Sequence, residues 1–418
     1  MRILWLTSYA PWPADFGGAR RTYHLIEQAA RAGHAIHLLA FADADPERTT
    51  AARAVLGRLC AAVDLIADPA AIPAAMGASD GAAVGRKRRG QLRSLLSLRP
   101  YQYFAHVSSA MQARLDALAG ERWDLVQVEF SQMGYYRLPA SAPAVLDLHN
   151  IEYEVLVRAA RAPGVGGVRR VYNRVEAGKF RREEPHVWRR FRALLTTSER
   201  DRRLVLAHRP EATVTVVPNG VDTVFFHPRP DDEAAQTARL VFTGMMAYYP
   251  NQDGATWLAD QIWPAVRAAV PAAELFIVGV EPPPAVQALA RPGTGITVTG
   301  AVPDVRPFVW DAALSVVPLR IGGGTRLKIV EALAMGKAVV STPLGCEGLQ
   351  VEPGRTLEVA ESAPDFAAAC VALLRDPARR AALGRAGRAL VQEHYDWTAV
   401  TRPMLDLWAR LLAVPVGG

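Results

Sequence analysis

The chain has 418 residues, of which 50% are hydrophobic, and it carries a formal net charge of +7 at pH 7. This length supports two domains with separate hydrophobic cores and argues against a single domain. The three cysteines, none in a CxxC spacing, argue against a disulfide framework or a zinc site and fit a reducing cytoplasm. No run of eighteen apolar residues occurs, so no segment is predicted to span a membrane.

Apolar runs of strand length alternate with amphipathic segments of helix length, a pattern typical of parallel sheets covered by helices on both faces. The first predicted strand, residues 2–8, leads into a Gly-Gly pair and a helix instead of a cleavage site, so it is not predicted to be a signal peptide. Further strands are predicted in the first half at 35–41, 124–130, 144–149, 193–198 and 213–218. A second series is predicted at 239–244, 274–280, 296–302, 314–319 and 338–342.

The best linker candidate is VPNGVDTVFFHPRPDDEAAQ, residues 217–236, which combines prolines, an Asn-Gly pair and an acidic polar run. We therefore predict a first domain over 1–217, a second domain over 218–392 and a C-terminal helical segment over 393–418. The predicted fold class is α/β, with two Rossmann-like doubly wound domains facing each other across a cleft. In such sheets ligands collect beyond the carboxyl ends of the strands.

The stretch GGGTRLKIVEALAMGKAVVST, residues 322–342, places three glycines between a strand and an amphipathic helix. Backbone N–H groups and the helix dipole make such a turn an anion site, where a cation without a bound anion is unfavourable by roughly 0.3–1 kcal/mol. We predict that Arg326 and Lys328 bind phosphate and that Glu331 accepts hydrogen bonds from a ribose diol. The turn would contribute the backbone of Gly322, Gly323 and Gly324 and the helix N-cap Thr325, and Gly336 would end the helix as its C′ residue.

A purely structural interpretation of this stretch is a surface helix in which Lys328 pairs with Glu331, three residues further on, and the glycines serve only a tight turn. The lysine-first order is the weaker orientation for such a pair. A glycine-rich turn, two cations and a glutamate coincide at one strand end, which favours the anion site.

The first domain repeats this arrangement in APWPADFGGARRTYHLIEQAARAGH, residues 10–34. The loop after the first strand contains Gly17 and Gly18, and the following helix begins with Arg20 and Arg21. The GxGxxG spacing is absent, so the match to a dinucleotide fingerprint is loose. We predict a second anion contact facing the cleft, and the alternative is a glycine turn with solvated arginines.

The stretch DLHNIEYE, residues 147–154, places His149 and Asn150 at the carboxyl end of a predicted strand. A histidine there can donate to a sugar hydroxyl or a phosphate, or act as an acid or base near neutral pH. A structural histidine with satisfied hydrogen bonds is the alternative.

Two short matches lack the context that their chemistry needs. GASDG, residues 77–81, fits G-x-S-x-G but does not follow a predicted strand, so a nucleophile elbow is not supported. DAD, residues 43–45, resembles a metal-binding DxD motif but lies in a polar loop without a second cluster of ligands.

Positive charge is concentrated in the first half of the chain. Residues 151–192 contain eleven Lys and Arg against five Glu, and residues 85–100 add six basic residues. No RNP or helix-turn-helix pattern accompanies them, so nucleic acid is not a predicted partner. RRGQLRSLLSLRPYQYF, residues 88–104, alternates basic and apolar residues as an interfacial helix on anionic lipid does, and a solvated face is the alternative.

Together, VVPNGVDTVFF, GTRLKIVEALAMGKAVVSTPLGCEGL, the Gly17-Gly18 pair and HNIEYE resemble a GT-B glycosyltransferase of the large retaining family four, the "group 1" transferases, of the bacterial surface or exopolysaccharide biosynthesis type. The resemblance spans essentially the whole chain and is most specific over residues 318–350. It implies a second domain that holds a nucleotide-diphosphate sugar and a first domain that receives the acceptor. It also implies a final helix that crosses back to the first domain, and no metal.

The resemblance assigns roles to individual residues. Glu331 matches the family's ribose-binding glutamate, His149 matches its histidine near the donor sugar, and the Gly17-Gly18 pair matches its loop beside the diphosphate. The predicted donor-binding residues are Gly17, Gly18, Asn219, Gly244, Gly322, Gly323, Gly324, Thr325, Arg326, Lys328 and Glu331. The predicted catalytic residues are His149, Arg326, Lys328 and Glu331, and the predicted acceptor-binding residues are Arg20, Arg21 and Asn150.

Two features depart from the family pattern. Many members carry another glutamate eight positions before the ribose-binding one, and that position here is Gly323. Many also place an arginine and a lysine soon after the first strand of the second domain, where this chain has GMMAYYPNQDG. The cations that face the phosphates are therefore predicted to be Arg326 and Lys328.

The predicted function is transfer of a sugar from a nucleotide-diphosphate sugar to a glycan or lipid-linked acceptor, with retention of anomeric configuration and without a metal or other cofactor. The predicted location is the cytoplasm, at the inner face of the membrane, with the basic first domain against anionic lipid. Two other functions stay open. A nucleotide-sugar epimerase on the same scaffold would convert the donor without an acceptor, and a non-catalytic nucleotide-sugar-binding protein would show no turnover.

Overall fold

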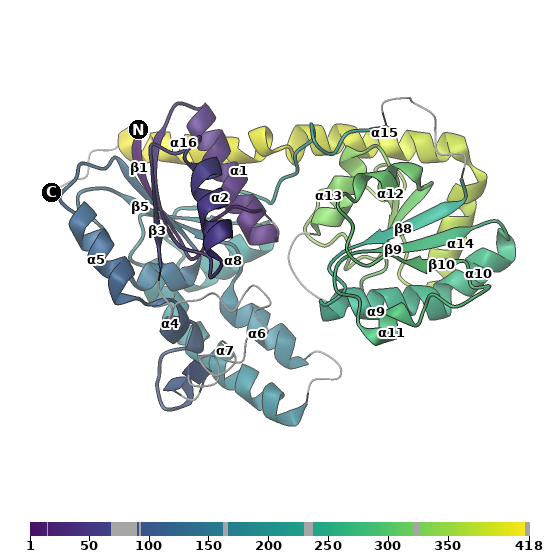
Figure 1. Ribbon diagram of the computed structural model, residues 1–418, viewed down its shortest axis with the longest axis horizontal. Helices are drawn as coiled ribbons and strands as arrows, with labels where there is room; N and C mark the ends of the chain where they lie inside the picture. Colours follow the sequence, from purple (N-terminus) through teal and green to yellow (C-terminus); the bar gives the residue numbers. More distant parts are fainter. Residues whose placement is uncertain are drawn as a thin grey trace. The chain divides into compact units, whose positions relative to one another are not determined.

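The computed structural model describes residues 1–14, 16–67, 90–91, 93–161, 166–229, 237–321 and 326–413. The chain divides into two compact units, Met1–Pro218 with Thr401–Gly418 (unit 1) and Asn219–Val400 (unit 2). Each unit contains one parallel β-sheet flanked by helices (Figure 1), so the predicted α/β class with two Rossmann-like units is confirmed. No helix in the described ranges is long and apolar enough to cross a membrane.

The sheet of unit 1 has seven parallel strands in the order β3-β2-β1-β4-β5-β6-β7. The strands are β1 (Arg2–Thr7), β2 (Ala35–Phe41), β3 (Ala62–Ile66), β4 (Leu125–Glu129), β5 (Ala144–Leu148), β6 (Ala193–Thr196) and β7 (Val214–Val216). The helices are α1 (Gly17–Arg31), α2 (Pro46–Leu56), α4 (Tyr101–His106), α5 (Ser109–Leu118), η1 (Ser131–Tyr135), α6 (Glu152–Arg161), α7 (Gly167–Trp188), α8 (Glu199–His208) and most of α16 (Trp397–Ala413). Strand β3 was not predicted because it is an edge strand of mostly half-buried side chains, interrupted by Asp64.

The sheet of unit 2 has six parallel strands in the order β10-β9-β8-β11-β12-β13. The strands are β8 (Arg239–Thr243), β9 (Glu274–Val278), β10 (Ile296–Val298), β11 (Leu314–Val317), β12 (Ala338–Ser341) and β13 (Glu358–Val359). The helices are α9 (Tyr249–Trp257), η2 (Leu258–Ile262), α10 (Trp263–Ala269), α11 (Pro284–Gln287), α12 (Arg306–Asp311), α13 (Leu327–Ala334), α14 (Ala363–Arg375) and α15 (Pro377–His394). The five predicted strands of this unit are present, and the two-residue β13 was too short to predict.

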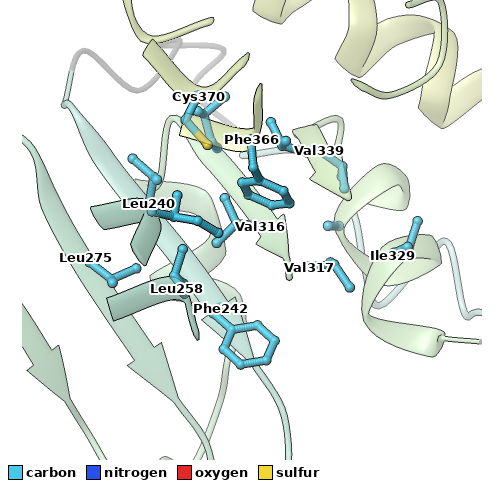
Figure 2. Packing of buried hydrophobic residues seen from close by; sticks show 14 of the residues in the cluster. Leu240, Phe242, Leu258, Leu275, Val316, Val317, Ile329, Val339, Phe366 and Cys370 are labelled. Atoms are coloured by element: carbon cyan, nitrogen blue, oxygen red, sulfur yellow. The ribbon is translucent and has the colours of Figure 1, made fainter. Parts of the chain in front are cut away.

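Alternate side chains of the central strand β8 enter two cores on opposite faces of the unit 2 sheet. Leu240 and Phe242 belong to the larger core, together with Leu258 of η2 and Phe366 of α14 (Figure 2). Val241, between them in sequence, packs instead in the smaller cluster that includes Val309 of α12. Each fully buried side chain of this kind stabilises the folded state by about 1.5–3 kcal/mol, which explains why helices cover both faces of the sheet.

Strand β1 has the same alternation in unit 1. Leu4 and Leu6 pack in a core with residues of α5 and α7. Trp5, on the opposite face of the strand, meets Trp408 of α16, with ring centroids 5.8 Å apart and an interplanar angle of 79°. Both tryptophans are fully buried. The C-terminal helix therefore completes the core of the unit that contains the N-terminus.

The strand order of each sheet has one switch point, where successive connections leave in opposite directions. In unit 1 it lies between β1 and β4, which pair with each other while β1 also pairs with β2. In unit 2 it lies between β8 and β11, and β8 pairs on its other side with β9. Ligands of doubly wound sheets bind outside the carboxyl ends of the strands at such points.

Candidate functional site

Helix α13, which follows β11 at the switch point of unit 2, starts one residue later than predicted. Its N-cap is Arg326, in extended conformation with φ −87° and ψ 91°, and not Thr325. Arg326 makes no side-chain cap bond, which a short Ser, Thr, Asp or Asn would supply and a long guanidinium does not. Gly322, Gly323, Gly324 and Thr325 lie outside the described residues, so the predicted glycine turn has no structural description.

The end of α13 confirms the predicted role of Gly336. This glycine follows the C-cap Met335 and has a φ of +69°, a left-handed conformation that glycine adopts without strain. Its N–H donates to the carbonyl of Leu333 at 2.9 Å, and the N–H of Lys337 donates to the carbonyl of Ala332 at 3.0 Å. These two bonds form a Schellman motif, which orients α13 by closing its C-terminus.

The ammonium of Lys328, in the first turn of α13, is held by side chains from two other elements. It donates to Oδ1 of Asn251 on α9 at 2.8 Å and lies 4.3 Å from the ring centre of Phe242 on β8. Burial and the nearby charge of Arg326 lower the pKa of Lys328 to about 7, and the charge of Glu331 opposes this shift. The site thus holds a cation whose protonation is finely balanced and would be favoured by a bound anion.

Gly244, directly after β8, lies against the same ammonium. Its φ is +155°, and a Cβ at this position would lie 2.7 Å from Nζ of Lys328 and 2.8 Å from Nδ2 of Asn251. A side chain would therefore displace the lysine or the amide. Two predicted donor residues, Gly244 and Lys328, thus lie together beyond β8. The third, Glu331, lies further along α13, and its charge acts on Lys328. Asn219, also predicted for this site, is half-buried at the first position of unit 2.

In unit 1, the glycine pair after β1 opens α1 as predicted, with Phe16 as the extended N-cap residue. A Cβ at Gly18 would overlap the hydroxyl of Tyr9, so only glycine allows this close approach. Nε of Arg20 donates to the carbonyl of Ala14 at 3.0 Å. This bond ties the start of α1 to the loop that precedes it.

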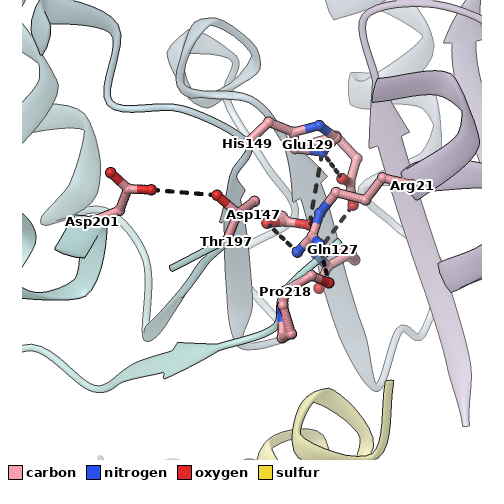
Figure 3. A network of polar contacts seen from close by, with 8 residues as sticks. All are labelled: Arg21, Gln127, Glu129, Asp147, His149, Thr197, Asp201 and Pro218. Carbon is pink, nitrogen blue, oxygen red and sulfur yellow. Dashed lines mark hydrogen bonds and ion pairs between the residues drawn. The ribbon is translucent and has the colours of Figure 1, made fainter. Parts of the chain in front are cut away.

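Arg21, which was predicted to bind the acceptor, instead lies in a buried ion pair. Its side chain is 1% exposed and binds both carboxylate oxygens of Asp147, at 2.8 and 3.1 Å, while Nη1 donates to the carbonyl of Pro218 at 3.0 Å (Figure 3). A guanidinium engaged in this way is unavailable to a ligand, because breaking a buried pair costs about 3–5 kcal/mol. The structure therefore gives Arg21 a structural role in place of the predicted acceptor contact.

His149 sits beside this ion pair, at the end of β5. Its Nε2 lies 2.7 Å from Oε2 of Glu129 on β4, and Glu129 also accepts from Nε2 of Gln127 at 3.2 Å. Glu129 is fully buried, and burial together with the charge of Asp147 raises its pKa. A carboxylate on Nε2 orients the imidazole, which leaves Nδ1 as the ring nitrogen available to a ligand.

The ring of Phe130 packs against the imidazole ring of His149, with ring centroids 3.8 Å apart. Phe130 has a φ of +70°, which is rare and strained for a residue with a side chain. It follows β4 at the switch point of unit 1, where strained residues are often functional. Asn150, the remaining predicted acceptor residue, is exposed next to the histidine.

Glu129, Asp147 and His149 are the one group in the described ranges that offers metal-ligating atoms close together, all within 4.8 Å of one another. These atoms already have partners. Arg21 occupies both oxygens of Asp147, and Glu129 is bonded to His149. A divalent cation would have to displace the guanidinium, so the residues fit an internal ion network better than a metal centre. The predicted independence from metal stays a prediction.

The sequence matches two models of known protein families. Residues 17–225 match the model described as Glycosyltransferase Family 4, and residues 237–376 match the model described as Glycosyl transferases group 1. Since the first match alone spans half of the chain, the protein belongs to glycosyltransferase family 4 and is a glycosyltransferase. A search of curated protein sequences finds no match.

Several solved structures share the fold along the whole chain. Sucrose-phosphate synthase from Thermosynechococcus elongatus has a TM-score of 0.67 at 18% identity, over 99% of this chain and 100% of that one. HepE from Anabaena, solved with UDP and glucose, has a TM-score of 0.64 at 15% identity, over 98% of this chain and 100% of that one. A glycosyltransferase from Rickettsia africae has a TM-score of 0.63 at 12% identity, over 98% of both chains. The fold is therefore that of GT-B glycosyltransferases.

Proposed function

We propose that the protein transfers a sugar from a nucleotide-diphosphate sugar to a glycan or lipid-linked acceptor, with retention of anomeric configuration and without a metal. The observation that carries this proposal is the convergence of Gly244, Asn251 and Lys328 at the switch point of unit 2. A lysine with a pKa of about 7 at a helix start gains most from an anion, and a diphosphate is such an anion.

In the proposed reaction, the acceptor hydroxyl attacks the anomeric carbon on the face from which the diphosphate leaves. The bond between this carbon and the diphosphate oxygen breaks, and the leaving phosphate takes the acceptor proton. Arg326 and Lys328 stabilise the negative charge that develops on the leaving group, which is the electrostatic work that a metal does in other transferases. Glu331 accepts from the ribose hydroxyls.

His149 is proposed to position the transferred sugar or the acceptor hydroxyl through Nδ1. Glu129 acts on it as a positioning residue, because its carboxylate holds Nε2 at 2.7 Å. The predicted location, cytoplasmic and peripheral on the inner face of a membrane, belongs to the same proposal, since a lipid-linked acceptor would be presented there.

Thermal stabilisation by nucleotides tests the donor site. UDP comes first, because the HepE structure holds it, followed by GDP, ADP, CDP and dTDP, all with a chelator present. A nucleotide at ~100 times its dissociation constant should add about 2.7 kcal/mol to the stability of the native state. Lys328→Ala and Glu331→Ala should lose this gain, whereas Arg355→Ala, an exposed arginine of unit 2, should keep it.

The outcome separates this function from its alternatives. Product with the anomeric configuration of the donor, seen by NMR, would support retaining transfer. Conversion of the donor sugar without any acceptor would point to an epimerase, and nucleotide binding without turnover under any acceptor would point to a non-catalytic binder. No stabilisation by any nucleotide in a folded protein would overturn the donor site.

A further inference from the structure

Helix α7 of unit 1 exposes a stripe of apolar side chains. Val168, Val171 and Val175 have 89%, 60% and 42% of their surface exposed. Their spacing of i, i+3 and i+7 places them along one face of the helix. Single exposed apolar residues are normal in proteins, but a row of them on one helix indicates a partner.

A second group of exposed apolar residues lies on residues 93–99, a segment bonded to α7. The carbonyl oxygen and Oγ of Ser94 accept from Nζ of Lys179, at 2.5 and 3.1 Å, and the same Oγ donates to Oε1 of Glu176. Lys179 and Glu176 both belong to α7, so these bonds hold the segment beside the helix. The residues that follow Ser94 expose 52%, 93% and 68% of their surface, and they are Leu95, Leu96 and Leu98.

Exposed arginines lie on the same two segments as these leucines and valines. Five exposed arginines lie on α7 and two on the bonded segment, namely Arg169, Arg170, Arg174, Arg181, Arg182, Arg93 and Arg99. Two of the three glutamates of α7, Glu176 and Glu184, are buried and add no negative charge to this surface. In Figure 1, α7 and its neighbour α6 extend away from the sheet of unit 1.

We infer that this face is a docking surface for an anionic lipid bilayer. The α7 surface is defined by its apolar residues Leu95, Leu96, Leu98, Val168, Val171 and Val175 and by the seven exposed arginines of the same two segments. Apolar side chains flanked by arginines are typical of helices that lie in the membrane interface, where the apolar face enters the acyl boundary by ~5–10 Å. The guanidinium groups then lie at the level of the lipid phosphates, with which they form charge-assisted hydrogen bonds.

A lipid bilayer accounts for both the apolar and the basic residues of this surface. An acidic protein would pair with the arginines, but only an apolar layer also covers Leu96 and Val168, which are almost fully exposed. The inference rests on the peripheral location proposed above and names the face of unit 1 responsible for it. It can fail while nucleotide binding and transfer remain, because no residue of the α7 surface belongs to the proposed donor site.

Flotation with lipid vesicles tests the inference. The full chain should float with vesicles of phosphatidylcholine and phosphatidylglycerol, but not with vesicles of phosphatidylcholine alone. Replacing Arg169, Arg174 and Arg182 by glutamine should weaken binding by about a hundredfold, since each arginine near an anionic surface contributes about fivefold. Replacing Leu95, Leu96 and Leu98 by serine should weaken it by at least about tenfold. Thermal midpoints should change little in either variant, because all six side chains are exposed.

Matched control variants replace the same kinds of residue outside the α7 surface. A variant with Arg291→Gln, Arg355→Gln and Arg385→Gln loses three exposed arginines of unit 2, and one with Val224→Ser, Val280→Ser and Leu412→Ser loses three exposed apolar side chains outside the α7 surface. Both should bind anionic vesicles as the wild type does. The inference is overturned if the wild type floats with neither kind of vesicle or equally with both. It is also overturned if the α7-surface variants bind like the wild type, or if the controls lose as much binding as they do.

Discussion

The ammonium of Lys328 donates a hydrogen bond of 2.8 Å to Oδ1 of Asn251, and Nδ2 of the same amide donates to the carbonyl of Met245 at 2.8 Å. The second bond sets the orientation of the amide, so its oxygen faces the lysine. Burial and the charge of Arg326 lower the pKa of Lys328 to about 7, and the neutral amide oxygen opposes this shift less than a carboxylate would. We therefore expect nucleotide binding at this lysine to depend on pH.

Nucleoside-diphosphate binding should weaken as the pH rises above about 7. Below that pH Lys328 is already protonated in the free protein, so affinity is nearly independent of pH. Above it, the diphosphate must bring a proton onto the lysine, and affinity should fall by up to about tenfold per pH unit. Calorimetry at pH 8 in two buffers of different ionisation enthalpy should detect the proton uptake.

Lys328→Gln provides the control for this pH dependence. The variant should bind the nucleotide weakly at every pH and take up no proton. A wild-type affinity that stays constant between pH 7 and pH 9 would contradict the assignment of Lys328 to the diphosphate.

Gly244→Ala should abolish most nucleotide binding while leaving the protein folded. The new Cβ would lie 2.7 Å from Nζ of Lys328 and 2.8 Å from Nδ2 of Asn251, so one of the two must move. We expect a loss of at least about tenfold in affinity, and a loss in stability of roughly 1–3 kcal/mol from the unfavourable φ of +155°. Titration calorimetry and urea unfolding measure the two effects.

Gly293→Ala separates backbone strain from the local clash. Gly293 has a φ of +80°, and no atom beyond its own residue and its two chain neighbours lies within 4 Å of its hypothetical Cβ. This variant should lose stability to a similar degree and keep its nucleotide affinity. Equal losses of affinity in the two variants would show that strain, and not the contact with Lys328, is responsible.

Glu129→Gln should lower the rate of transfer at least about tenfold without changing nucleotide affinity. The amide keeps the shape of the carboxyl but removes the charge that orients Nε2 of His149 at 2.7 Å. Asp64→Asn is the matched control, because Asp64 holds Nε2 of His37 at the same distance of 2.7 Å elsewhere in this sheet. Its rate of transfer should stay at the wild-type level, and steady-state kinetics with saturating donor compare the two.

Glu152→Gln should stabilise the protein, and more so at higher pH. Burial raises the pKa of Glu152 from 4.5 to about 7 in the folded protein, while the unfolded chain releases its proton near the ordinary value. Between these two pH values the folded state binds more protons, so wild-type stability falls as the pH rises through this window. The variant cannot ionise and should gain about 1–3 kcal/mol relative to the wild type at pH 8, and nearly nothing at pH 4.5.

Urea unfolding at several pH values checks this expectation, with Glu393→Gln as a control at a side chain that is 74% exposed. The control should follow the wild type at each pH. A stability difference between Glu152→Gln and wild type that does not change with pH would mean that folding does not raise the pKa of this carboxyl.

Trp408→Ala should cost about 3–5 kcal/mol of stability, because it removes a fully buried indole from its contact with Trp5. Leu412→Ala, on the same helix but 40% exposed, should cost well under 1 kcal/mol. Denaturant unfolding compares the two. Similar losses in both would show that α16 does not complete the core of unit 1.

The sequence was sufficient to predict the parallel sheets, because buried strands such as β8 and β11 consist mostly of apolar side chains. The helix after β11 was also recognisable, since Lys328 near its start is at odds with the helix dipole and therefore indicates an anion. Asn251 could not be found in the same way. Its amide matters only because α9 places it beside Lys328, and no local pattern in the sequence encodes that contact.

Arg21 shows a signal that sequence reasoning overlooked. The buried residues of α1 include Arg21, Leu25 and Ala29, spaced four apart on one face. The same helical period that places the leucine in the core also places the arginine there, so its partner had to be a buried acid. Glu129 gave a similar signal, because it ends a strand whose side chains are all buried.

The contact between Trp5 and Trp408 also has a consequence for the synthesis of the protein on the ribosome. Trp5 is made some 400 positions before Trp408, the residue that covers it. At about 5–20 residues per second this interval is roughly 20–80 s, during which one face of β1 lacks its cover. Unit 2, whose residues are contiguous in the chain, can finish folding first, so the protein is expected to complete its domains in the reverse of their order in the gene.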